Sequence, residues 1–208
     1  MSAKYDELAE RFTEHEYGDP ERYFGRRAEI VVALGPPLER GDTILDLACA
    51  DGSAVPPLAA RGVGYRGVDA SEAMLDVARR RHGDRATFEL GDLSTYAPPE
   101  PVAATTIFRS LHLVDDRLAF FRHVAGFTEK KLVFDFAPRR YWVEELRAEL
   151  TAAGFDALAT RPFLVPQHGR LPRPAAAALE VFERIPPAAA LLLHVRFALI
   201  CAAFKSEV

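Results

Sequence analysis

The fold of this chain is determined by the stretch Thr43-Ile44-Leu45-Asp46-Leu47-Ala48-Cys49-Ala50-Asp51-Gly52-Ser53. A short apolar run ends in an acid, a loop of small residues follows, and the pattern predicts that a helix begins there. Open α/β sheets use this strand, tight turn and helix N-terminus to hold a nucleotide-like ligand. The alternative interpretation is an ordinary strand–turn–helix junction, because small-residue loops are common in α/β folds.

A dinucleotide ligand is disfavoured by this loop. The dinucleotide fingerprint Gly-x-Gly-x-x-Gly falls here on Ala48, Ala50 and Ser53, so none of its glycines is present. Side chains at these positions would crowd a pyrophosphate at the helix N-terminus. S-adenosylmethionine has no phosphate, and an acid such as Asp46 can meet its ammonium group. The loop therefore favours the methyl donor.

At this loop the chain resembles the class I S-adenosylmethionine-dependent methyltransferases. Their signature after the first strand is acid-x-Gly-x-Gly-x-Gly, and the positions here are Asp46, Ala48, Ala50 and Gly52. The acid and the last glycine match, while two glycines are alanines. If position 50 needs a positive φ, alanine costs about 1 kcal/mol there. Position 48, at a strand end, is expected to have no such need.

Two further acids end predicted strands and support the resemblance. Asp69 ends the strand 63–69 and lies 17 positions after Gly52, close to the spacing expected for an acid that holds ribose hydroxyls. Asp92 ends the third predicted strand, within 86–93. Each acid alone is equally well explained as a helix cap or a loop residue. Three of them in order favour a donor site.

The resemblance covers nearly the whole chain and implies which residues hold the donor. Asp92 would receive the adenine amino group, and Ala70 and Leu93 would enclose the ring. Arg27 could pair with the methionine carboxylate, or it could be a surface arginine. The full expected set is Tyr23, Arg27, Asp46, Ala48, Gly52, Asp69, Ala70, Met74, Asp92, Leu93 and Arg109.

Composition limits the class of protein. The chain has 208 residues, 49% of them hydrophobic, a net charge of −4 and a pI of about 5.9. One domain with a sizeable core is expected, without a global attraction to nucleic acid. The basic cluster Arg79–His82 is interpreted as a solvated helix end, and Cys49 and Cys201 as core residues without metal-site spacing, so no metal is expected.

The sequence predicts an α/β, Rossmann-like, doubly wound sheet of about seven mostly parallel strands, in which the resemblance implies an antiparallel last strand. The apolar run 188–204 contains an arginine and is too short to span a membrane, so a helix 188–193 and a strand 195–204 are expected instead. The charged N-terminus shows no signal peptide, so the protein is predicted to be cytoplasmic. The expected parts are a helical cover 1–37, a nucleotide-binding core 38–162, a helical insertion 163–193 and the last strand 194–208.

The N-terminal segment is predicted to be an amphipathic helix over residues 3–15, followed by a helix that Asp19 caps and Pro20 begins. In the resembled family such an extension covers the active site. Packing on the sheet for stability is an equally weighted interpretation. An aromatic wall above the site would come from Tyr5, Phe12, His15 and Tyr17, although aromatic residues at helical spacing more often belong to a core.

The acceptor is expected at the ends of the fourth and fifth strands. Arg109-Ser110-Leu111-His112 follows the fourth and lacks the Asn/Asp-Pro-Pro-aromatic motif of methyltransferases that act on DNA bases or protein amides. His112 could act as the general base, or it could be a histidine bonded to backbone. Arg139, with Tyr141 beside it, could hold an anionic acceptor, or begin a solvated helix.

The leading hypothesis is therefore methyl transfer from S-adenosylmethionine to an oxygen or nitrogen of a small molecule, by a monomer or homodimer without nucleic-acid or membrane partners. The alternative, motivated by Ala48 and Ala50, is a protein of this fold that binds the donor for regulation without transferring the methyl group.

Overall fold

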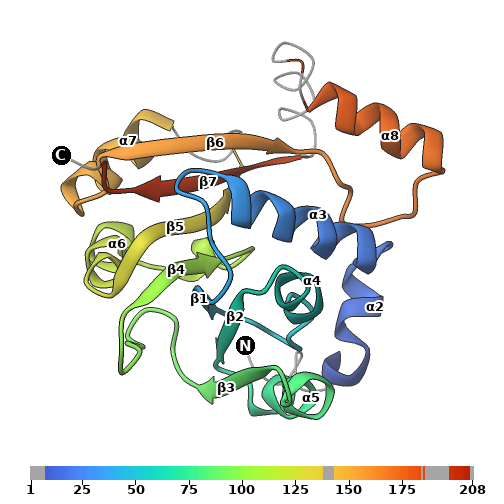
Figure 1. Ribbon diagram of the computed structural model, residues 1–208, viewed down its shortest axis with the longest axis horizontal. Coiled ribbons are helices and arrows are strands. Elements are labelled where there is room, and N and C mark those ends of the chain that lie inside the picture. Colours follow the sequence, from blue (N-terminus) through green and yellow to red (C-terminus); the bar gives the residue numbers. More distant parts are fainter. Residues whose placement is uncertain (1–7, 138–142, 184, 186–196, 207–208) are drawn as a thin grey trace.

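The structure is a computed structural model that describes residues 8–137, 143–183, 185 and 197–206. A seven-stranded sheet forms its centre (Figure 1). The elements are, in chain order, η1 (Ala9–Arg11), α2 (Phe12–Glu16), α3 (Pro20–Ala33), β1 (Thr43–Leu47), α4 (Val55–Ala59), β2 (Gly64–Asp69), α5 (Glu72–His82), β3 (Ala86–Leu90), β4 (Val102–Ile107), η2 (Leu111–Leu113), α6 (Arg117–Ala125), β5 (Thr128–Phe136), α7 (Val143–Ala152), β6 (Ala157–Phe163), α8 (Arg173–Phe182) and β7 (Ala198–Phe204).

The strand order is β3-β2-β1-β4-β5-β7-β6. Strands β1 to β5 run parallel, and β7 lies antiparallel between β5 and β6. The predicted fold class is confirmed, including the antiparallel last strand. The chain leaves β1 toward β2 and later returns to β4 on the other side, so the loops after β1 and β4 diverge. Ligands of open α/β sheets bind at such a switch point, outside the carboxyl ends of the strands.

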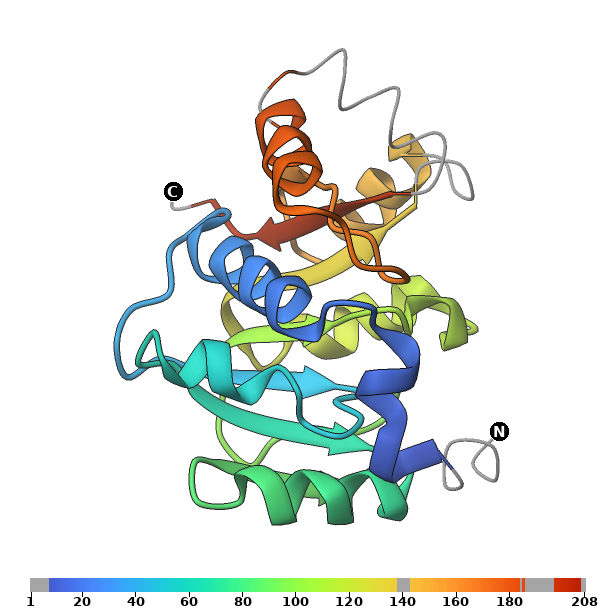
Figure 2. The ribbon, with the colours of Figure 1, turned by 90° about the vertical axis from the view of Figure 1, so that its right-hand side faces the viewer.

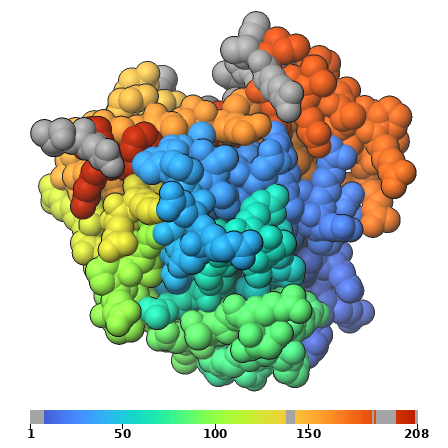
Figure 3. Space-filling view, viewed as in Figure 1, coloured from blue at the N-terminus to red at the C-terminus, as the bar shows by residue number. Residues whose placement is uncertain are grey.

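Two apolar layers enclose the sheet. On one face, α3, α4 and α5 pack against it through a cluster that includes Ile30, Val55 and Leu75. On the other face, α6 and α7 pack through a cluster that includes Phe121 and Leu146. Figure 1 shows α6 on the left of the sheet and α4 and α5 on its right, and Figure 2 looks onto the side that α3, α4 and α5 cover. Figure 3 gives the space-filling view in the orientation of Figure 1. No helix in the described part of the chain is long and apolar enough to cross a bilayer.

The N-terminal segment differs from the prediction. A single helix over 3–15 was expected, but the described part consists of η1 and α2. The break falls at Arg11, whose φ of −120° and ψ of 13° interrupt the helix. The segment is held by contacts to other parts of the fold, described below, and these outweigh its helical periodicity.

The second helix agrees with its prediction. Asp19 caps α3 by accepting a hydrogen bond from the Arg22 amide at 3.3 Å. The predicted helix 188–193 lies outside the described residues. Strand β5 begins three positions earlier than the predicted start at Lys131, because Thr128 pairs with Val102 across a register shift in β4.

The loop after β1 turns through left-handed backbone conformations. Ala48 has φ 65°, Ala50 has φ 49° and Gly52 has φ 73°. The expectation that position 48 needs no positive φ is therefore wrong, because the chain already reverses direction at the end of the strand. All three positions that the methyltransferase signature assigns to glycine adopt the conformation that glycine allows most easily.

A buried lysine joins the sheet to α3. Lys131 is fully buried in β5, and its Nζ donates to the carbonyl oxygens of Val32 at 3.1 Å and Leu34 at 2.7 Å. These carbonyls lie at the end of α3, where free acceptors and the helix dipole favour a cation. Burial lowers the pKa of Lys131 to about 8.

Replacing Lys131 with methionine should flatten the pH dependence of stability. The native pKa of about 8 lies below the ordinary value of 10.5. Between these values the unfolded state binds more protons, so native stability rises with pH. From pH 8 to pH 10 the wild type should gain about 2 kcal/mol relative to Lys131→Met. Denaturant unfolding of both proteins across this range measures the difference, and parallel profiles would contradict it.

Replacing Ala48 with glycine should raise the free energy of unfolding by about 0.5 kcal/mol. Removing Cβ relieves a left-handed penalty of about 1 kcal/mol or more, and the added freedom of the unfolded chain offsets part of this. Ala60 is the matched control, because it is exposed and has an ordinary φ of −60°. Ala60→Gly should lose about 0.5–1 kcal/mol. Equal losses in both variants would show that the loop is unstrained.

Candidate active site

The main cavity opens at the carboxyl ends of the strands and has a volume of about 480 Å³. Most of the residues predicted to bind the donor line it. They are Arg27, Asp46, Ala48, Asp69, Ala70, Met74, Asp92, Leu93 and Arg109. Gly52 lies behind this wall, where a Cβ would meet Phe88, Ala78 and His82 at 3.1–3.2 Å. We call this space the donor cavity.

Asp69 fixes the loop after β1. Its Oδ2 accepts a hydrogen bond from the Ala50 amide at 2.8 Å, and its Oδ1 accepts one from the Ser71 amide at 3.0 Å. Burial raises the pKa of Asp69, and these amides act in the opposite direction. The carboxylate thus joins the loops that follow β1 and β2, and it remains on the cavity wall.

Asp46 lies deeper and is held by two hydroxyl groups. Tyr65 donates to its Oδ2 at 2.5 Å, and Thr106 donates to its Oδ1 at 2.7 Å. Burial raises the pKa of Asp46, whereas the charge of Arg27 lowers it. Neither hydroxyl was predicted from the sequence, because their proximity to Asp46 depends on the pairing of β1 with β2 and β4.

Asp92 is exposed at the outer end of the cavity. Its Oδ1 accepts a hydrogen bond from the Ser94 amide at 2.8 Å, which sets the turn after β3. Leu93 lies beside it and Ala70 lies on the neighbouring loop, so the three residues assigned to the adenine share one end of the cavity.

Arg27 is a buried cation on the cavity wall. Its guanidinium carbon lies 4.6 Å from the ring centre of Phe24 and 4.4 Å from that of Phe108. Its neighbours on α3 make ion pairs, Arg22 with Glu180 and Arg26 with Glu183. Within the described residues Arg27 has no such acidic partner. Its charge therefore remains available to a ligand in the cavity.

The N-terminal segment closes one side of the donor cavity. Phe12, Glu16 and Tyr17 line it, in keeping with the predicted cover. Tyr17 is also buried in the core, with its ring centre 4.7 Å from that of Tyr23. The two interpretations of this segment, cover and core, are therefore compatible. His15 lines neither cavity described here, and its side chain is 61% exposed.

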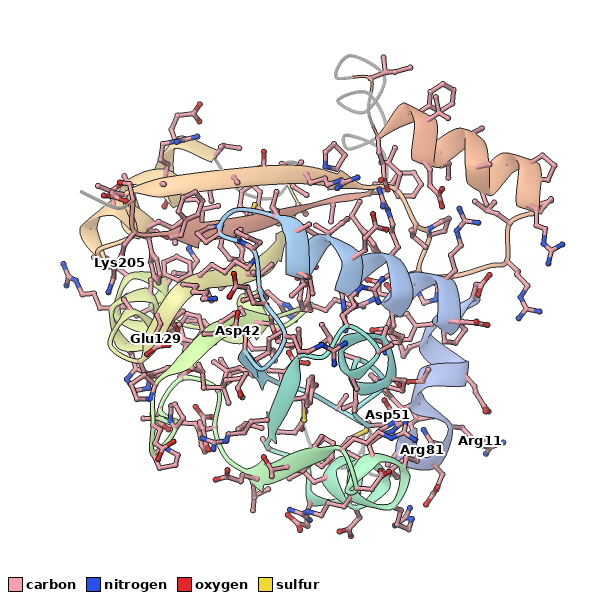
Figure 4. All side chains as sticks on the ribbon, in the orientation of Figure 1. Arg11, Asp42, Asp51, Arg81, Glu129 and Lys205 are labelled. Carbon is pink, nitrogen blue, oxygen red and sulfur yellow. The ribbon has the colours of Figure 1, made fainter. Side chains whose placement is uncertain are left out.

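A polar cluster around Asp51 fastens this segment to the loop. Thr13 donates to the Asp51 carboxylate at 2.7 Å, and Arg81 donates to it at 2.9 Å. Figure 4 shows Asp51 and Arg81 side by side next to α2. Asp51 carries no clear sequence signal, because an acid beside a glycine is typical of a solvated turn.

The basic cluster at the end of α5 is consequently more than a solvated helix end. Arg81 also donates to the Glu10 carbonyl at 2.8 Å, and Arg80 pairs with the Glu10 carboxylate. Both arginines are exposed, as a solvated helix end predicts, and in addition η1 packs against α5 and brings Glu10 to them. Arg79 pairs with Glu72 and Asp76 on its own helix.

A second cavity, of about 310 Å³, adjoins the donor cavity. Arg109 and His112 line both spaces. Tyr23 lines this second cavity rather than the donor cavity. His112 is exposed on η2, directly after β4. Tyr5, Arg139 and Tyr141, which were predicted to bind substrate, lie outside the described residues. We call this second space the side cavity.

Asp135 lies at the end of β5 and lines the side cavity. Its Oδ1 accepts a hydrogen bond from the Arg109 amide at 2.6 Å, and Arg109 has a positive φ of 59°. Asp135 could not be recognised from the sequence, because nothing in the apolar run of β5 indicates that this acid contacts the loop after β4. In the described residues, no three His, Cys, Asp or Glu side chains gather as a metal site.

Comparison with known proteins finds a domain family that matches part of the chain. A family model described as a methyltransferase domain matches residues 44–131, from β1 into β5. No curated protein matches the chain.

Several solved structures share the fold. Magnesium protoporphyrin IX methyltransferase from Synechocystis, with bound S-adenosylmethionine, has 20% identity, coverage of 94% of this chain and 85% of that chain, and a TM-score of 0.60. A chain of the Haloferax volcanii complex between the Trm112 methyltransferase activator and a putative methyltransferase has 17% identity, 98% coverage of both chains and a TM-score of 0.66. The glycopeptide N-methyltransferase MtfA, with S-adenosylmethionine, has 16% identity, coverage of 92% and 96%, and a TM-score of 0.63.

These identities show the fold, and the family match adds the methyltransferase domain. The predicted family and methyl donor are confirmed by the two together. Residues 44–131 therefore match a methyltransferase domain, and the chain has the fold of the class I S-adenosylmethionine-dependent methyltransferases.

Proposed function

We propose that this enzyme transfers a methyl group from S-adenosylmethionine to a nitrogen or oxygen atom of a small molecule. The observation that carries the proposal is the pair of adjoining cavities with Arg109 and His112 on their common wall. One space suits the donor, the other suits an acceptor, and the two meet where β4 ends.

The donor cavity fits the chemistry of S-adenosylmethionine. The donor carries a carboxylate and an ammonium at one end and a ribose and an adenine at the other. Arg27, a buried guanidinium without an acidic partner in the described residues, suits the carboxylate, and Asp46 suits the ammonium. Asp69 and Asp92 follow toward the other end, in the order needed for ribose and adenine. When bound, the donor supplies a methyl group on a positively charged sulfur.

A small molecule is the favoured acceptor class. The side cavity is of the size typical of small-ligand sites. The net charge of −4 opposes binding to nucleic acid. Among the structural neighbours are enzymes named for magnesium protoporphyrin IX, phosphoethanolamine and a glycopeptide. Because these acceptors differ, they do not indicate a single acceptor for this chain. The acceptor class is therefore inferred from the residues that line the side cavity.

The protein contributes mainly by positioning and by exclusion of water. The N-terminal segment, fixed by Asp51, closes the donor cavity on one side. Aromatic rings on α3 and at the start of the loop after β4 lie against Arg27. A rigid, partly dry site of this kind lowers the entropic part of the barrier. His112 borders both cavities, so it is placed to take a proton from an acceptor.

Replacing Asp69 with alanine should weaken the binding of S-adenosylhomocysteine about ten- to a hundredfold. The variant loses charge-assisted hydrogen bonds worth roughly 1.5–3 kcal/mol. Isothermal titration calorimetry measures the change, with circular dichroism as the test of folding. Asp84→Ala is the control, because Asp84 is exposed at the opposite end of the sheet and should leave affinity unchanged. Unaltered affinity in a folded Asp69→Ala protein would refute the assignment.

Replacing His112 with alanine should lower turnover about 10²–10⁴-fold with an acceptor that the enzyme methylates, if His112 is the base. The variant should fold and bind S-adenosylhomocysteine like the wild type, because His112 is exposed. Single-turnover kinetics with labelled methyl groups measures the effect. Turnover within a few-fold of the wild type would assign catalysis to positioning alone.

A further inference from the structure

Aromatic and polar residues share the lining of the side cavity. The aromatic lining residues are Tyr23, Phe136, Phe163 and Phe197, Val165 and Ala198 are aliphatic, and the polar ones include Arg109, His112, Asp135 and Gln167. Tyr23 and Phe163 meet edge to face, with ring centres 5.0 Å apart and an interplanar angle of 88°. Such a surface binds apolar groups, and the faces of its rings attract cations.

Asp135 is the only acid among the described residues that line this cavity. It lies at the end of β5 and is half-buried. Its Oδ1 is bonded to the Arg109 amide at 2.6 Å. No ion pair to Asp135 is present within the described part of the chain, so its negative charge is not directly neutralised there.

Arg109 orients Asp135 through its backbone amide, and its own backbone is strained in this conformation. Its φ of 59° is unusual for a residue other than glycine. In this conformation its amide faces Asp135, while its side chain is exposed at the wall that the two cavities share. Arg109 therefore holds Asp135 through its backbone, and its guanidinium makes no ion pair with Asp135.

The charge environment of Asp135 leaves room for a cationic ligand. Burial is the largest influence and raises the pKa of Asp135, while the positive charges of Arg27 and Arg109 lower it. An ammonium group in the cavity would add a close positive charge and a hydrogen-bond donor. A carboxylate in the same place would be repelled by Asp135 and would meet the negative faces of the rings.

The outer wall of the side cavity is fixed by contacts that do not involve a ligand. Gly18 donates through its amide to the Gln167 carbonyl at 2.8 Å, and Gln167 donates through its side chain to Glu16 at 3.2 Å. The Leu164 amide donates to Glu183 at 3.0 Å, and Glu183 pairs with Arg26 on α3. This wall is thus preformed, which lowers the cost of binding.

We propose that the side cavity binds a small amine with an apolar or aromatic body, and that Asp135 holds the nitrogen as an ammonium group. The proposal rests on the proposed function and narrows it, since it makes the acceptor a nitrogen compound rather than an alcohol, phenol or carboxylate. Asp135 acts here as the acceptor-binding residue. Methyl transfer needs the nitrogen lone pair, so the bound ammonium first gives a proton to His112, which borders both cavities. The amine nitrogen then bonds to the methyl carbon while the carbon–sulfur bond breaks, and S-adenosylhomocysteine is the leaving group.

The test compares three probes of nearly equal shape: phenethylamine, 2-phenylethanol and phenylacetate. Their affinities for the protein saturated with S-adenosylhomocysteine are measured by calorimetry near pH 7. Phenethylamine should bind at least about tenfold more tightly than 2-phenylethanol, and phenylacetate should bind most weakly. Equal affinities, tighter binding of phenylacetate, or no measurable binding of phenethylamine would overturn the proposal.

Variants assign the preference to a residue. Asp135→Asn keeps an oxygen for the Arg109 amide but removes the charge, so the preference for phenethylamine should fall to about twofold or less. Asp115→Asn is the control, because Asp115 is exposed and lines neither cavity. An amine preference that persists in a folded Asp135→Asn protein would refute the role of this acid. If that variant does not fold, the ranking of the probes on the wild type decides.

A failure of the amine proposal can be distinguished from a failure of the proposed function. Binding of S-adenosylhomocysteine is measured first and depends on the donor cavity. If it fails, the methyl-donor assignment to this cavity fails, and the probes are then ranked on the protein without it. If it succeeds and the amine preference is absent, only the acceptor class is wrong.

Discussion

The active site depends on the hydrogen bond between the Ala50 amide and the Asp69 carboxylate. It joins the loop after β1 to the end of β2, and with the Ser71 amide it sets the position of the acid at the centre of the donor cavity. The loop can offer this amide only because Ala48 and Ala50 adopt left-handed conformations. The strain in this loop is therefore coupled to the geometry of the binding site, as strained backbone at functional sites often is.

The two buried charges of the site, on Asp46 and Arg27, do not pair with each other, so a ligand can supply a partner to each. Asp46 is buried and relies on hydroxyl donors from Tyr65 and Thr106, whereas Arg27 lies between aromatic rings without an acid beside it in the described residues. A buried charge without a direct partner keeps its desolvation penalty, and a ligand group of opposite charge can offset that penalty. A ligand that carries both an ammonium and a carboxylate satisfies both, and an amino acid end has this property. Dinucleotides lack it, which agrees with the absence of glycines at 48 and 50.

Features that depend on neighbouring residues could be predicted from the sequence. Features that depend on contacts between residues far apart in the chain could not. Asp46, Asp69 and Asp92 could be recognised because each ends an apolar strand, and Asp19 because capping is local. The break at Arg11 could not be predicted, since it follows from the contacts of Glu10 and Thr13 with α5 and the loop. Ala48 was misjudged because a position at a strand end seldom requires a positive φ, whereas here the chain already turns at that position. Asp51 and Asp135 gain their significance only when the sheet brings separate loops together.

Arg109 connects the two halves of the site. Its amide holds Asp135 in the side cavity, and its side chain borders the donor cavity. A change of backbone conformation at this residue would therefore move the acid and alter the wall between the cavities at the same time. A residue other than glycine keeps a left-handed backbone conformation only when its surroundings stabilise that conformation. The hydrogen bond from the Arg109 amide to Asp135 requires this conformation and also stabilises it. A ligand that neutralises Asp135 would thereby also affect the backbone at the wall that the two cavities share.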